Sequence, residues 1–211
     1  GKCSRKNVTE YVRIGRFGFL FSGERKLHER QASLLLHTSL IHQVDMRIDY
    51  MDVYSSVDKR IDSRIDFMRV TANDNQLVKN QIQIGDVLFT PSSETADDIG
   101  HSAVVTESLP NTLYSYHLVR LSFKRDIDIN FKRFLFNNPK ILYDFSRKAK
   151  GVTRMTLSLE DFNSTEFRLP PMQEQKKIAN ELSLVVDNMI LCEGEIFSSH
   201  TLLKTLINQV F

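Results

Sequence analysis

Apolar residues lie in short runs along most of the chain and in a longer, more regular pattern along its last part. The short runs are rich in β-branched and aromatic residues and are separated by turn-forming residues, a combination that predicts β-strands. Helical patterns interrupt these runs, so the sequence predicts a mixed α/β (α+β) domain over residues 1–168. The predicted strands lie within residues 8–14, 44–53, 87–89, 103–105 and 118–123, and the predicted helices within 24–36, 129–136 and 140–150.

The apolar pattern changes after Pro170 and Pro171, because apolar positions then recur alternately every four and three residues. An average repeat of 3.5 residues is typical of a helix that packs lengthwise against another helix. The pattern predicts one long helix over residues 169–211, and the alternative is two shorter helices that turn back at Gly194. A helix of roughly 35–40 residues extends for about 55 Å, well beyond a domain of this size, so its apolar seam needs a partner. The seam consists of Ile178, Leu182, Val185, Met189, Cys192, Ile196, Leu203, Leu206 and Val210.

Composition limits the class of protein. The chain has 211 residues, of which 41% are hydrophobic and 26% are charged, and these values fit one globular domain with an appendage. No apolar run approaches the roughly 20 residues that a membrane-spanning helix needs, so we expect no membrane association. The two cysteines, Cys3 and Cys192, form no disulfide framework, which predicts a cytoplasmic location.

Charge is distributed unevenly, although the net charge of the chain is only +2. Residues 120–154 contain ten Lys or Arg and three Asp, which gives this stretch a charge of +7. A basic face of this kind attracts polyanions such as nucleic acid. An ordinary solvated helix surface is the alternative explanation.

The sequence offers no pattern for catalysis, metal binding or cofactor binding. Its six histidines show no H-x-x-x-H spacing, and no cysteine lies near enough to them in sequence to suggest zinc. The sequence also lacks phosphate-binding loops, dinucleotide-binding glycine motifs and the nucleophile elbow of hydrolases. We therefore expect a protein that is not an enzyme and that binds no metal or cofactor itself.

Two polar segments have the chemistry to contact nucleic acid. Residues 90–95 follow a predicted strand and carry small hydroxyl side chains, which hydrogen-bond phosphates or base edges in other proteins. Residues 148–154 place three cations around Gly151 and the Thr153 hydroxyl. Such cations bind phosphates, and an Arg also reads guanine in the major groove. A plain turn stabilised by Ser and Thr is the alternative for the first segment.

The chain resembles the specificity subunit of type I restriction–modification enzymes from about residue 40 onward. The most specific element is Pro170-Pro171 followed by Glu174-Gln175 and Ile178-Ala179, directly ahead of the heptad pattern. The order and spacing of the other matching segments add to the likeness. These segments are residues 50–54, 85–95, 99–100, 114–120, 153–158, 168–182 and 202–211.

This resemblance implies a DNA-reading function without catalysis. Members of the family usually carry two target-recognition domains, each followed by a helix, and the two helices form an antiparallel coiled coil that spaces the two halves of a bipartite DNA target. The subunit docks two methyltransferase subunits, which use S-adenosylmethionine. In the full complex, it also carries two restriction subunits, which use ATP and Mg.

This sequence contains one recognition domain, over residues 1–168, and one helix, over residues 169–211, so the resemblance implies a half-length form. Two copies are then expected to pair their helices as a homodimer and to bind double-stranded DNA. The alternative is a homodimeric coiled-coil interaction protein that binds or competes for the methyltransferase subunit without reading DNA.

The candidate DNA-binding residues follow from the polar segments together with the resemblance. The loop expected to face DNA comprises Thr90, Ser92, Ser93, Glu94 and Thr95. The expected phosphate contacts are Lys148, Lys150, Thr153 and Arg154, and Arg154 is also the candidate for a base contact. A second basic group lies within repeated Arg-Ile-Asp tripeptides, where surface ion pairing is the favoured alternative, and it comprises Lys59, Arg60 and Arg64.

Overall fold

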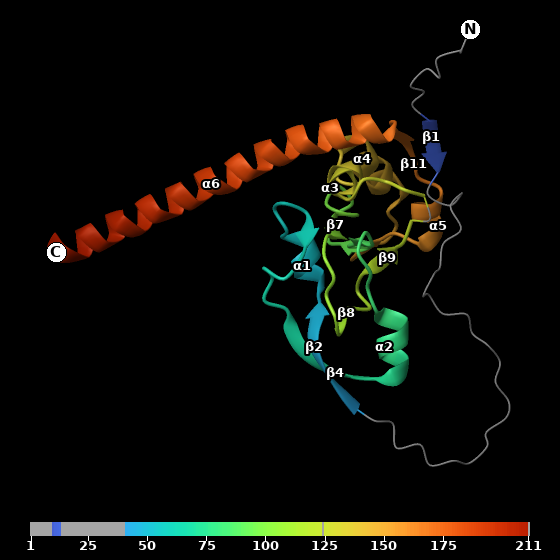
Figure 1. Cartoon of the computed structure of the whole chain (residues 1–211), viewed down its shortest axis with the longest axis horizontal. Coiled ribbons are helices and arrows are strands. Elements are labelled where there is room, and N and C mark those ends of the chain that lie inside the picture. Colours follow the sequence, from blue (N-terminus) through green and yellow to red (C-terminus); the bar gives the residue numbers. More distant parts are fainter. Residues whose placement is uncertain (1–9, 14–40, 124, 211) are drawn as a thin grey trace, which may run out of the picture.

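The computed structural model describes residues 10–13, 41–123 and 125–210. Figure 1 shows a domain of short strands and helices from which one long helix extends, as the sequence predicts. The predicted helix at 24–36 lies outside the described residues. The elements are β1 (Glu10–Arg13), β2 (Ile41–Ile48), α1 (Tyr50–Tyr54), β3 (Arg60–Ile61), β4 (Met68–Asn73), α2 (Asp74–Asn80), β5 (Val87–Phe89), β6 (Ser92–Ser93), β7 (Ser102–Val105), β8 (Thr112–Tyr114), β9 (Val119–Leu121), α3 (Ile129–Leu135), α4 (Pro139–Lys148), β10 (Met155–Thr156), α5 (Leu159–Asn163), β11 (Glu166–Leu169) and α6 (Met172–Val210).

The described strands form four small sheets. One has the order β3-β7-β5-β9, a second has the order β4-β2-β8, and the pairs β1-β11 and β6-β10 are separate. Strand β2 is antiparallel to β4 but parallel to β8, and β3 is parallel to β7. The domain therefore combines parallel and antiparallel pairing, which agrees with the predicted mixed class.

The apolar run at 44–53, which the sequence predicts as a strand, contains both a strand and a helix. Its first part lies in β2, whereas α1 begins at Tyr50. Asp49 is the N-cap of this helix, and the Asp52 carboxylate accepts a hydrogen bond from the Asp49 N–H at 2.7 Å. This capping box starts a helix where apolar residues alone suggest a continuing strand.

Strand β5 of the four-stranded sheet β3-β7-β5-β9 is buried on both faces. In β5, Val87 and Phe89 pack into one apolar cluster, whereas Leu88 packs into another. The Phe89 ring meets Phe136 and Phe162 edge-on, with ring centroids 5.4 and 5.2 Å apart. Strands covered on both faces are apolar at successive positions, which explains the continuous run at 87–89.

Gly100 lets the connection between β5 and β7 pass close to α4. It has a φ of +81°, and a Cβ atom at this position would lie 2.5 Å from Cδ2 of the buried Phe145 ring. Any larger residue would meet both a strained backbone and the core. This close approach fixes the loop at 90–100 on the domain.

Helix α6 is continuous from Met172 to Val210, so the long-helix prediction is confirmed. Gly194 lies inside it, and nothing is within 4 Å of the position that a Cβ would occupy. The helix is attached to the domain at its start. There the Gln175 amide donates to the Pro170 carbonyl at 2.8 Å and accepts from the Asp128 N–H at 3.0 Å. The predicted domain boundary at 168/169 falls within β11, three residues before the helix begins.

Candidate nucleic-acid interface

The two polar segments that the sequence suggests for DNA binding lie side by side. Strand β6 pairs antiparallel with β10, with Ser92 opposite Thr156 and Ser93 opposite Met155. The Leu157 N–H also donates to the Pro91 carbonyl at 2.8 Å. Residues about sixty positions apart in sequence therefore form one surface, which no local pattern predicts.

A tight exposed hairpin projects from this surface. The backbone groups of Lys150 and Thr156 hydrogen-bond each other at 3.0 and 2.9 Å, and the intervening residues form the turn. Gly151 has a φ of +149°, and a Cβ atom there would lie 2.0 Å from the Arg154 carbonyl oxygen. Lys150, Thr153 and Arg154 are all exposed. The hairpin thus presents two cations and a hydroxyl on a turn that only glycine allows.

Two tyrosines of α1 hold the neighbouring loop. The Tyr50 hydroxyl donates to the Ser92 carbonyl at 2.7 Å, and the Tyr54 hydroxyl donates to Asp98 Oδ2 at 2.8 Å. The His101 Nε2 lies 2.8 Å from the other carboxylate oxygen of Asp98. The sequence does not predict this network, because Ser92 and Asp98 lie 42 and 44 residues after the tyrosines that bind them.

The pKa values of both phenols are raised above the ordinary value. Burial raises the pKa of the Tyr50 phenol, while the Thr90 hydroxyl and the charge of Arg154 oppose this rise. The hydrogen bond to Asp98 and the charge of that carboxylate raise the pKa of the Tyr54 phenol. Both phenols therefore stay protonated and act as hydrogen-bond donors that orient the loop.

An exposed aromatic pair lies between β8 and β9. The rings of Tyr116 and His117 have centroids 3.9 Å apart, and Tyr116 is 84% exposed. The strands on either side of the pair are placed by register, with Tyr114 opposite Ile48 and Val119 opposite Phe89.

The loop at 90–95 exposes only some of its candidate DNA-binding side chains. Thr90 is fully buried, and its hydroxyl donates to the His101 carbonyl at 3.3 Å. Ser93 is buried in β6, whereas Ser92 is half-buried, and Glu94 and Thr95 are exposed. The Thr90 and Ser93 side chains are therefore not available to DNA, because both are buried within the domain.

Lys148 is also misplaced by the sequence prediction. Its ammonium group donates to Asp144 Oδ2 at 2.6 Å, to the hydroxyl of the buried Thr165 at 2.7 Å and to the Asp161 carbonyl at 3.2 Å. Three acceptors satisfy the three N–H groups of a lysine. Lys148 thus joins α4 to α5 and is not available as a phosphate contact.

Two of the three cations in the second basic group, Arg60 and Arg64, form ion pairs, which is the favoured alternative. Arg64 donates to Asp58 at 2.6 Å and to Asp62 at 2.7 Å, and Arg60 Nε lies 3.9 Å from Asp58. The hydrogen bond from Arg64 holds the pKa of Asp62 below its ordinary value. Burial lowers the pKa of Lys59, whose ammonium donates to the Tyr54 carbonyl at 3.5 Å.

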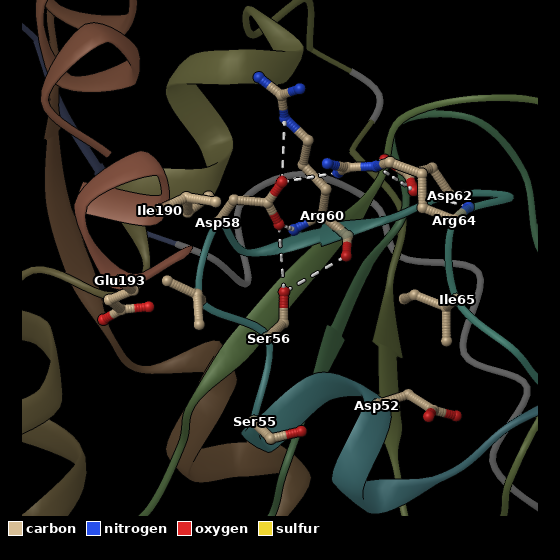
Figure 2. Close-up of a pocket in the computed structure, with 11 residues that line it drawn as sticks. Asp52, Ser55, Ser56, Asp58, Arg60, Asp62, Arg64, Ile65, Ile190 and Glu193 are labelled. Carbon is tan, nitrogen blue, oxygen red and sulfur yellow. Dashed lines mark hydrogen bonds and ion pairs between the residues drawn. The ribbon is translucent and has the colours of Figure 1, made fainter. Parts of the chain in front are cut away.

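These ion pairs line a depression against α6. Figure 2 shows the ion-paired residues on one side and Ile190 and Glu193 of the helix on the other. The cavity has a volume of about 340 Å³ and contains four acidic residues, Asp52, Asp58, Asp62 and Glu193. Acidic residues outnumber the basic ones, so this surface does not suit a polyanion.

The apolar seam of α6 is largely exposed, as predicted, but its first residue is not. Ile178 is half-buried against the main apolar cluster, because the start of the helix packs on α3. Leu182, Val185, Met189, Cys192, Ile196, Leu203 and Leu206 are exposed, and the Val210 side chain lies outside the described residues. Further exposed apolar side chains lie outside the seam, at Leu184, Leu191, Phe197 and Leu202.

A buried arginine fixes the junction between the domain and α6. Arg133 of α3 is fully buried and donates to the Asp58 carbonyl at 2.7 Å and to the Ser183 hydroxyl of α6 at 3.2 Å. Burial, followed by the nearby charge of Arg60, lowers the pKa of Arg133 to about 10. Arg133 belongs to the basic stretch at 120–154, but its hydrogen bonds join α3 to the rest of the domain and to α6.

Over residues 10–13, 41–123 and 125–210, no group of three or more His, Cys, Asp or Glu side chains is arranged to hold a metal ion. In the same residues, no helix combines the length and the apolar character needed to cross a membrane.

Comparisons with known proteins identify the family. Residues 61–196 match the family described as Type I restriction modification DNA specificity domain. No curated protein sequence matches the chain significantly. The fold is similar to that of the HsdS subunit from Thermoanaerobacter tengcongensis, with a TM-score of 0.55 and 15% identity over 91% of this chain and 45% of that one.

A second solved structure, from work on complex assembly and conformational transition of the type I R-M system, has a TM-score of 0.53 and 13% identity. That match covers 92% of this chain and 43% of the other, so the chain spans less than half the length of these structures. The family match covers more than half of this chain. The chain therefore belongs to the type I restriction modification DNA specificity domain family.

Proposed function

We propose that this chain is the DNA sequence-recognition subunit of a type I restriction–modification system and that its domain reads one half of a bipartite target. The observation that carries the proposal is the β6-β10 pairing. It joins the exposed end of the loop at 92–95 to the hairpin that carries Lys150 and Arg154. The family match of residues 61–196 supports the same function.

The chemistry of the joined surface suits base reading more than simple charge neutralisation. Arg154 has the donors for guanine, and Glu94 has the acceptor for a cytosine amino group. Lys150 supplies charge for a nearby phosphate. The two tyrosines of α1 keep the loop in place, so little conformational freedom is lost when DNA binds.

Helix α6 would set the distance between two half-sites. Its 39 residues extend for about 58 Å, at about 1.5 Å per residue. Two copies would pair their seams antiparallel and form a homodimer with a symmetric bipartite target. The exposed apolar residues outside the seam, such as Leu184 and Leu191, would remain for docking methyltransferase subunits.

In this proposal the chain carries no catalytic group. S-adenosylmethionine would be bound by the methyltransferase subunits, and ATP and Mg by the restriction subunits. The exposed apolar face of α6 also favours a second candidate, a homodimeric interaction protein that binds or competes for the methyltransferase subunit without reading DNA.

Selection from a randomised double-stranded DNA pool distinguishes the two candidates. The full chain is incubated with the pool at moderate salt, and the bound duplexes are sequenced. We expect enrichment of a short motif, and we expect Arg154→Ala to reduce both affinity and enrichment. A dimer that enriches no motif would favour the interaction protein and refute the DNA reader.

Cross-linking tests the pairing of α6. Position 192 is one residue from the midpoint of Met172–Val210, so full antiparallel overlap places the two copies of Cys192 close together. In a Cys3→Ser background, a short bis-maleimide should give a species of twice the 24.4 kDa of one chain. Light scattering that gives the mass of one chain at all concentrations would refute the homodimer.

A further inference from the structure

Helix α4 presents a polar stripe that lies in the basic stretch at 120–154 but outside the candidate DNA-binding residues named from the sequence. Lys140, Tyr143 and Arg147 occupy positions i, i+3 and i+7, which lie on one face of a helix. All three are exposed, whereas Ile141 and Phe145 on the opposite face are buried in the core. We call these three exposed residues the α4 ridge.

The positive charge of the α4 ridge is not neutralised by the acid of its own helix. Asp144 is the one acidic residue of Pro139–Lys148, and it is paired with Lys148 at 2.6 Å on the side facing α5. It also accepts from the Thr165 hydroxyl at 3.0 Å. Within the described part of the chain, neither Lys140 nor Arg147 forms an ion pair with a carboxylate.

The tyrosine of the ridge supports its neighbouring cation. The Arg147 guanidinium carbon lies 6.0 Å from the centre of the Tyr143 ring, and this ring is itself 64% exposed. A guanidinium over an aromatic face gains a cation–π attraction while its donors stay available. The phenol adds a hydroxyl that is able to hydrogen-bond a phosphate oxygen.

The ridge continues directly into the hairpin. Helix α4 ends at Lys148, and the exposed Lys150 and Arg154 follow within six residues. From Lys140 to Arg147 the helix advances about 10 Å. Lys140 and Arg147 are thus spaced for separate phosphates, and the hairpin adds two further exposed cations.

We propose that the α4 ridge is a phosphate-binding track that holds the DNA backbone while the loop and hairpin read bases. This inference rests on the proposed DNA-reading function and extends it to residues outside the reading loops. Unpaired cations and a phenol hydroxyl are the groups that bind phosphates without regard to sequence. The ridge therefore contributes affinity and position rather than specificity.

The salt dependence of DNA binding measures how many phosphate contacts the α4 ridge makes. The affinity of the full chain for its selected duplex is determined from low to moderate salt, for the unchanged chain and for Lys140→Ala/Arg147→Ala. Each phosphate contact contributes about −0.9 to the slope of log affinity against log salt concentration. The double variant should therefore have a shallower slope, by about 2. The selected motif should stay the same.

A matched variant controls for the loss of two surface charges. Arg69 and Lys79 are also exposed but lie on β4 and α2, so Arg69→Ala/Lys79→Ala should leave the slope unchanged. An unchanged slope in the ridge variant would overturn this inference alone. A ridge variant that keeps its slope but loses a methyltransferase subunit would also overturn it, by assigning the ridge to a protein contact. An unchanged chain with no salt-dependent DNA binding would instead refute the proposed function.

Discussion

Gly151→Ala tests whether the geometry of the hairpin holds its reading residues in place. At a φ of +149° an L-residue is strained by about 1–3 kcal/mol. The added Cβ would also lie 2.0 Å from the Arg154 carbonyl oxygen, a distance that no side-chain rotation relieves. Because the hairpin is exposed, the chain should relieve this contact by moving residues 151–154 and leave the core intact. We expect the free energy of unfolding to fall by about 1–3 kcal/mol.

Displacement of Arg154 in this variant should also lower the DNA affinity. One good side-chain contact to a base is worth about 1–3 kcal/mol, so affinity for the selected duplex should fall roughly 5- to 150-fold. Fluorescence anisotropy measures this affinity, and urea unfolding measures the stability of the same samples. Gly194→Ala is the matched control, because its Cβ meets open space in a helix. It should leave affinity unchanged and add about 1 kcal/mol of stability. If Gly151→Ala binds DNA within about twofold of the unchanged chain, the hairpin does not position the reading residues.

Three other substitutions separate structural from functional side chains. Lys148→Ala should lower the free energy of unfolding by about 1–3 kcal/mol, since Thr165 loses a buried partner, and should leave DNA affinity unchanged; an affinity loss without a stability loss would contradict this assignment. Arg64→Gln should cost under about 1 kcal/mol at pH 7, because Arg64 is largely exposed. Since Arg64 depresses the pKa of Asp62, this stabilisation is present above the ordinary pKa of 3.8 and disappears as pH falls through the depressed pKa; urea unfolding at several pH values checks it, and a difference that persists in acid would refute it. Tyr54→Phe removes the hydrogen bond to Asp98 and should weaken DNA binding several-fold, which anisotropy would reveal.

The sequence predicts best where one local cause decides the outcome. The heptad pattern after Pro171 predicts α6 because a helix needs only its own backbone hydrogen bonds, and Gly194 costs about 1 kcal/mol against the rest of a long helix. The apolar run at 87–89 predicts β5 because a strand buried on both faces is apolar at every position. The run at 44–53 is less predictable, since the acidic cap at Asp49 competes with the apolar pattern.

The sequence also predicts that the loop at 90–95 and the basic stretch at 120–154 matter, but it does not predict which side chains face outward. Lys148 and Arg147 are adjacent and chemically similar, yet α4 turns the first toward Asp144 and Thr165 and the second toward solvent. Thr90 is buried directly after the end of β5, and Arg133 is buried because α3 packs on α6.

The sequence alone determines the family, the helix and the segments that carry polar chemistry, because these follow from residue type and spacing. Only the tertiary structure decides the candidate surface itself. Pairing of β6 with β10 joins segments about sixty residues apart, and this pairing depends on the packing of the whole domain. The sequence gives the number of cations in a segment. Packing decides which of them donate hydrogen bonds within the domain and which remain available to a ligand.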